Sequence, residues 1–118
     1  MKPQESQPLT PAVFHILLAL ADGEKHGYRI MQAVKANSRG DFQIGPGTLY
    51  GSIKRMLADD LIAEAEERPD PELDDQRRRY YRLTDRGRIT LQADLARMDA
   101  LLQRARALQI HPASVVRR

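Results

Sequence analysis

Arginine and lysine are the side chains whose number and spacing point most directly to a chemistry in this 118-residue sequence. Lys54 and Arg55 are adjacent near the middle of the chain, and six arginines fall within residues 77–88. Clustered cationic groups bind phosphate oxygens, and a guanidinium can also read guanine. The alternative for the arginine run is a solvated strand whose arginines pair with acids of the same chain.

Residue types that support catalysis or hold metals do not form a recognisable set. The chain has no cysteine, and its three histidines lack the spacing of metal ligands. We interpret His26 as a helix-start cap or packing residue. No serine can be assigned to a Ser–His–Asp set, and Gly45-Pro46-Gly47 lacks the lysine of a phosphate-binding loop. The sequence therefore predicts no catalytic residue, metal or cofactor, and we do not expect an enzyme.

Charge is distributed very unevenly along the chain. The formal net charge is +3, but residues 59–75 hold nine acids and one arginine, a net −8 that leaves +11 elsewhere. A basic body suits a polyanionic partner such as nucleic acid. We interpret the acidic stretch as a solvated loop that DNA would repel. We therefore expect its tip, Arg68 to Asp75, to point away or to be disordered, with the neighbouring arginines partly paired to it.

Hydropathy gives no sign of a membrane or an export signal. No apolar run approaches the roughly 20 residues of a membrane helix, and residues 1–8 lack the apolar segment of a secretory signal. Together with the missing cysteines, these features favour the cytoplasm and a partner other than a membrane.

The elements that must position these residues begin with three short helices. Thr10-Pro11 gives an N-cap followed by proline, and an apolar face follows at Phe14, Leu17, Leu18 and Ala21. A second helix is predicted over residues 26–37. A third is predicted over residues 46–58, with Leu49, Ile53 and Met56 toward the core.

Two strands and a long helix follow. Apolar and acidic residues alternate at 62–66, and aromatic residues mark a second strand at 79–83. On that strand Tyr81 and Leu83 should face the core, with Tyr80 on the other side. Three helices, a hairpin and a helix over 85–108 predict a mainly α (α+β) winged helix-turn-helix, with the third helix as recognition helix and the hairpin as wing.

The outer face of the third helix is thin and basic. It holds Gly47, Thr48, Gly51, Lys54 and Arg55, with Tyr50 at the border of core and groove. A mid-helix glycine such as Gly51 costs about 1 kcal/mol relative to alanine. Either close approach to base edges or close packing against a neighbouring helix would explain it.

The last helix carries an apolar seam that one small domain cannot cover. The seam repeats at spacings of four and three residues and is made of Leu91, Leu95, Met98, Leu102 and Ala105, widened by Leu101 and Leu108. We predict that the same helix of a second copy covers it, giving a twofold homodimer. The alternative is a helix that folds back over its own domain.

Motifs along the chain resemble those of the PadR family of bacterial transcriptional regulators. They are His26-Gly27-Tyr28-Arg29-Ile30, Gly47-Thr48-Leu49-Tyr50, Leu57, Leu61-Ile62 and Tyr80-Tyr81-Arg82-Leu83-Thr84-Asp85-Arg86-Gly87, within residues 9–108. The single short C-terminal helix resembles the compact branch of the family. The resemblance implies a homodimeric repressor on a palindromic operator, released by a small-molecule effector, with Thr48 and Tyr50 contacting DNA. Gly51 stands where the family often has proline, and the acidic segment around Pro69-Asp70-Pro71 is also atypical.

These observations lead to one expected organisation and one expected function. Residues 1–9 form a flexible arm, 10–83 a DNA-binding domain, 84–110 a dimerisation helix and 111–118 a tail. The expected contacts with double-stranded DNA are Gly47, Thr48, Tyr50, Gly51, Lys54, Arg55, Arg77, Arg78 and Arg79. Inverted half-sites would lie about 34 Å apart. The alternative function is a winged-helix protein-interaction module that no longer binds DNA.

Overall fold

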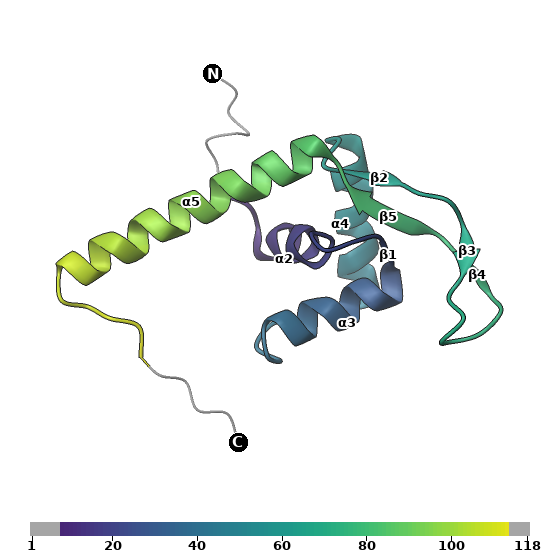
Figure 1. Ribbon diagram of the computed structural model, residues 1–118, viewed down its shortest axis with the longest axis horizontal. Coiled ribbons are helices and arrows are strands. Elements are labelled where there is room, and N and C mark those ends of the chain that lie inside the picture. The colour runs from purple at the N-terminus through teal and green to yellow at the C-terminus, as the bar shows by residue number, and fades with distance from the viewer. Residues whose placement is uncertain (1–7, 114–118) are drawn as a thin grey trace.

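The computed structural model describes residues 8–113 and contains four helices and five short strands within them (Figure 1). Their order is α2 (Pro11–Ala19), β1 (Lys25–His26), α3 (Gly27–Asn37), α4 (Pro46–Ala58), β2 (Ile62–Glu64), β3 (Arg68–Pro69), β4 (Arg77–Arg78), β5 (Tyr80–Leu83) and α5 (Asp85–Ala107). This is the expected winged helix-turn-helix order, with α3 and α4 as the helix-turn-helix pair and β2 to β5 as the wing.

Helix α2 begins as the sequence predicts, and its buried face overlaps the expected one only in part. The hydroxyl of Thr10 accepts a hydrogen bond from the Val13 N–H at 3.3 Å, and Pro11 opens the helix. The fully buried side chains include Ile16, Leu17 and Leu20, whereas Phe14 and Leu18 of the expected face are only half-buried. Because α2 is apolar almost all round, its spacing fits either face, and packing against α3 and α4 decides between them.

The core lies where α2, α3 and α4 meet and is mostly aliphatic. Ile30 and Val34 of α3 and Leu49 of α4 are fully buried against the α2 side chains. Their side chains recur at helical spacing, which is why the sequence identifies them. The close packing of these three helices fixes the position of α4 relative to α3.

Three strands form the base of the wing in the order β1-β5-β2, all antiparallel. Ile62 pairs with Leu83, and His26 pairs with Tyr80. Beyond this sheet β3 and β4 pair as a separate ribbon, which extends the wing (Figure 1). Strand β1 leaves no signature in the sequence, because two residues are too few to show an alternating pattern.

Tyr80 lies on the opposite side of β5 from the core residue Tyr81, as the sequence predicts, but that side is covered as well. Tyr80 and Tyr81 are 7% and 5% exposed, so both faces of β5 are covered at this point. Tyr80 packs edge-on against the His26 ring, with centroids 5.2 Å apart, and the Arg68 guanidinium lies 3.6 Å from the Tyr80 ring centre. Short strand patterns show alternation but not which other segments cover each face.

Helix α5 starts against the domain and then leaves it. The Thr84 hydroxyl caps the helix by accepting from the Gly87 N–H, and a Cβ at Gly87 would lie 2.0 Å from the Leu61 carbonyl oxygen. Leu91 and Asp94 are buried against their own domain. From residue 95 the helix projects away from the three-helix core (Figure 1), so the folded-back alternative does not describe this part.

Within residues 8–113, no helix is both long enough and apolar enough to span a bilayer.

Candidate nucleic-acid interface

The outer face of α4 is open along its length. Pro46 occupies the first turn after the Gly45 N-cap, and Leu49, Ile53 and Met56 turn into the core. All six α4 residues expected to contact DNA are exposed: Gly47, Thr48, Tyr50, Gly51, Lys54 and Arg55. The structure therefore leaves this face accessible to a partner.

No atom of residues 8–113 packs against the position of a side chain at Gly51. A Cβ built at Gly51 would meet no atom within 4 Å, and the same holds at Gly47. Close packing against a neighbouring helix of the same chain, one of the two explanations for a mid-helix glycine, is therefore wrong. Close approach of an external partner to the α4 backbone is the explanation that remains.

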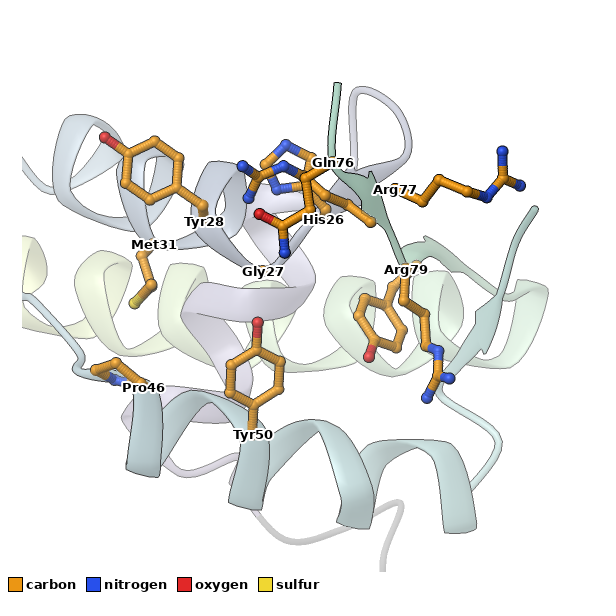
Figure 2. A pocket seen from close by; sticks show the side chains of 11 residues that line it. His26, Gly27, Tyr28, Met31, Pro46, Tyr50, Gln76, Arg77 and Arg79 are labelled. Carbon is orange, nitrogen blue, oxygen red and sulfur yellow. The ribbon is translucent and has the colours of Figure 1, made fainter. Parts of the chain in front are cut away.

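Tyr50 is positioned by a glycine at the start of α3. Its ring rises from α4 and directs the hydroxyl at Gly27, as Figure 2 shows. A Cβ at Gly27 would lie 2.2 Å from that hydroxyl oxygen, so only glycine leaves room for this arrangement. The Gly27 and Tyr50 of the two sequence motifs thus meet in space, and Tyr50 remains half-exposed.

A cavity of about 360 Å³ opens between α3, α4 and the wing (Figure 2). Tyrosines from three elements line it, namely Tyr28, Tyr50 and Tyr81, together with the three consecutive wing arginines Arg77, Arg78 and Arg79. Aromatic faces beside guanidinium groups suit phosphate and sugar contacts. The cavity thus places the three wing arginines beside Pro46 and Tyr50, in the first half of α4.

Each of the three wing arginines is paired with a carboxylate of the wing itself. Arg78 lies 2.9 Å from the Asp74 carboxylate, and Arg77 lies 3.8 Å from that of Glu67. Arg79 lies 3.8 Å from the carboxylates of both Glu64 and Glu67. These arginines therefore pair with acids of the same chain, as expected from the sequence.

The acidic tip of the wing, Arg68 to Asp75, is ordered and is attached to the body of the protein, so the disorder that charge alone allows is not found. Asp70 is 8% exposed, and its Oδ2 lies 2.8 Å from Nε2 of His26 and 2.9 Å from Nε of Arg29. Since a carboxylate only accepts, His26 Nε2 is the donor. The carboxylate of Glu72 also binds Arg29, at 3.0 Å. The segment is therefore docked on the start of α3.

Hydrogen bonds hold the Asp70 carboxyl in its charged form. Donation by Arg29 and His26 lowers the pKa of Asp70 well below its usual range, against the opposing effect of burial. Sequence reasoning missed this residue because it lies among eight other acids, and its partners are 41 and 44 positions away. His26, interpreted from the sequence as a cap or packing residue, occupies the N-cap position of α3 while its side chain binds Asp70.

Residues expected at a dimer interface divide into two groups. Leu91 is 5% exposed and packs in the core of its own chain. Ala105 is half-buried, and the others are exposed: Leu95, Met98, Leu101, Leu102 and Leu108. The seam that one chain leaves uncovered therefore begins at Leu95.

The described part of the chain contains no group of three or more histidines and acids arranged to hold a metal ion.

Comparison with known proteins places these features in a family. The model of the transcriptional regulator PadR-like family matches residues 16–93. The chain is 36% identical over 99 residues to Transcriptional regulator Rv3488 of Mycobacterium tuberculosis, covering 84% of this chain and 86% of that protein. It is also similar in fold to two solved structures.

The first solved structure is a PadR family transcription regulator from Clostridium difficile, with a TM-score of 0.68 and 23% identity over 85% of this chain and 99% of the other. The second is a PadR-like transcriptional regulator from Bacillus cereus, also with a TM-score of 0.68, at 19% identity over 85% and 92% of the two chains. At these identities the two structures share the fold.

Proposed function

The chain belongs to the PadR-like family of transcriptional regulators, and we propose that it regulates transcription by binding double-stranded DNA through α4 and the wing. The observation that carries this proposal is the open basic face of α4. Lys54 and Arg55 are exposed there, and nothing in the part of the chain that the structure describes covers the backbone at Gly47 and Gly51. A helix with such a face can enter the major groove closely, with its cations reaching phosphate or guanine.

The acting species is a homodimer joined through α5. With 23 residues, α5 is about 35 Å long, and most of its apolar side chains from Leu95 onward are exposed in the single chain. Pairing two such helices about a twofold axis buries them and presents two copies of α4. Two half-sites about one helical turn apart, in inverted orientation, would match that symmetry.

The regulator is proposed to act in the cytoplasm as a repressor that occupies a palindromic operator and is released by a small-molecule effector. Twofold symmetry supports the palindrome. The repressor role and the effector rest on the family resemblance. Half-buried Phe14 and Leu18 and exposed Met98 mark the place, between α2 and the paired α5 helices, where we expect a cavity for the effector.

The test is binding to the duplex that lies upstream of the protein's own coding sequence. Wild type should bind with an affinity that falls steeply with salt, and Lys54→Ala with Arg55→Ala should lower the salt slope by up to about four for two subunits. Arg104→Ala with Arg106→Ala, on the distal part of α5, removes the same charge and should change binding far less. No salt-sensitive complex with wild type would contradict the proposal and favour the protein-interaction alternative.

A further inference from the structure

The wing carries more negative than positive charge where it should approach DNA. Residues 64–79 hold seven carboxylates and four arginines, a net −3. The three arginines that line the cavity beside α4 are the ones paired with Glu64, Glu67 and Asp74. In the free protein their guanidinium groups already have anionic partners, so a DNA phosphate must compete for them.

These carboxylates cannot simply move away from the arginines. The segment that bears them is held on the body of the protein by Asp70, which binds His26 and Arg29. A second contact, 3.0 Å between Arg68 and Glu24, holds the base of the same segment. A tethered partner acts at a high effective concentration, so its competition does not depend on dilution.

The pairs of Arg77 and Arg79 are also weak enough to be exchanged, whereas Arg78, whose side chain is 21% exposed, is held more firmly by Asp74 at 2.9 Å. The side chains of Arg77 and Arg79 are 63% and 55% exposed, and Glu67 is 47% exposed. Ion pairs this exposed to water contribute little to stability, so a phosphate can replace the carboxylate. The wing is therefore arranged for exchange of anions rather than for a permanent structural bridge.

We propose that the acidic segment of the wing is an autoinhibitory competitor that occupies Arg77, Arg78 and Arg79 until DNA phosphates displace it. The inference rests on the proposed function and adds to it a built-in limit on affinity. Displacement frees carboxylates that take up cations, and this uptake offsets part of the cation release from DNA. The competitor therefore lowers affinity most at low salt and makes the salt dependence shallower.

Replacing Glu67 by Gln and Asp74 by Asn tests this directly. Both changes remove a charge and keep the shape, and the new amide at position 74 retains an oxygen that can accept from the Gln76 N–H, as the Asp74 carboxylate does. The double variant should bind both its own upstream duplex and a random duplex on the order of tenfold more tightly at low salt. The gap should close as salt rises, with a steeper salt slope than wild type.

The matched control is Asp60→Asn with Asp99→Asn, which makes the same change in net charge away from the wing arginines. Asparagine tolerates the positive φ of 60° at residue 60, and Asp99 bonds only to Gln103 of α5 in the contacts seen. If the Glu67→Gln, Asp74→Asn variant binds DNA no more tightly than this control at low salt, the proposal of an autoinhibitory competitor is wrong. Absence of salt-sensitive binding by wild type and both variants would instead overturn the proposed function, and the competitor with it.

Discussion

Two glycines show how single residues shape the DNA-facing side of α4. Gly27 leaves room for the Tyr50 hydroxyl, so its lack of a side chain is used inside the protein. Gly51 leaves open space instead, so its lack of a side chain has no use within the chain. Replacing such a glycine by alanine stabilises the helix. The same replacement weakens the binding of any partner that needs the space above the glycine.

Gly51→Ala should therefore move stability and binding in opposite directions. We expect unfolding to become harder by about 1 kcal/mol, because alanine is the better helix former and its methyl meets no atom of the chain. DNA affinity should fall by on the order of tenfold, because the methyl would stand between the backbone and the bases. Thermal unfolding and a DNA titration measure the two effects, and unchanged affinity would show that bases do not approach Gly51.

The wing behaves as an element with two attachments. Its base is a three-stranded sheet, and its distal ribbon is held to α3 through Asp70. Arg29 binds two acids there, of which the Asp70 side chain is 12% exposed and that of Glu72 is 83% exposed. Because water screens the exposed Arg29–Glu72 pair, the more buried Arg29–Asp70 pair should account for most of the docking.

Asp70→Asn should loosen the ribbon far more than Glu72→Gln. Asparagine at position 70 removes the negative charge to which both His26 and Arg29 bind. Glutamine at position 72 removes only one solvent-exposed contact with Arg29. The Leu73 and Asp74 amides donate to the Asp70 carbonyl, so their hydrogen exchange reports the docked turn. We expect exchange to accelerate by on the order of tenfold in the first variant, and similar rates in the two variants would contradict this account.

The same contact should make docking sensitive to acid. Because the folded pKa of Asp70 is lower than its unfolded value of about 4, its contribution is complete above that value. The contribution is lost as pH falls from about 4 through the lower folded pKa. Protection of the Leu73 amide, which is its exchange rate relative to an unstructured peptide at the same pH, should therefore be high at neutral pH and fall in strong acid. The Asp70→Asn variant should not show this acid-dependent fall. A wild-type ribbon that undocks between pH 5 and 7 would be inconsistent with it.

At the scale of the whole molecule, α5 divides into a part that belongs to its own domain and a part that needs a second copy. Thr84, Gly87 and Leu91 fix the first part on the domain. Leu95, Met98 and the leucines beyond remain in water in a single chain. Exposed apolar surface of this extent is costly unless another surface covers it.

Met98→Glu should therefore separate the subunits. A carboxylate in the paired seam would be buried without a partner, so light scattering at micromolar concentration should show a monomer. Loss of two linked half-sites should lower affinity for a two-site duplex by about a hundredfold. Ile89→Glu is the control, since at about 100° per residue Ile89 lies on the opposite side of α5 and is 64% exposed. A dimeric Met98→Glu protein would show that the seam is not the interface.

Local pattern determined the order of elements, the caps and the outer face of α4. Thr10 and Thr84 mark helix starts by a hydrogen bond within three residues, and Leu49 and Ile53 recur at helical spacing. Interactions over so few residues leave their signature in the sequence. The same holds for the apolar seam after Leu95.

Only the tertiary structure decided which α2 face is buried, how Tyr80 is covered and where the acidic segment lies. Each depends on segments that are far apart in the chain, such as His26 and Asp70, which are 44 positions apart. In the sequence Asp70 is one of nine acids in a segment that is expected to be solvated. In the folded chain it is buried and accepts hydrogen bonds from His26 and Arg29. The energy of that contact comes from geometry that no local periodicity encodes.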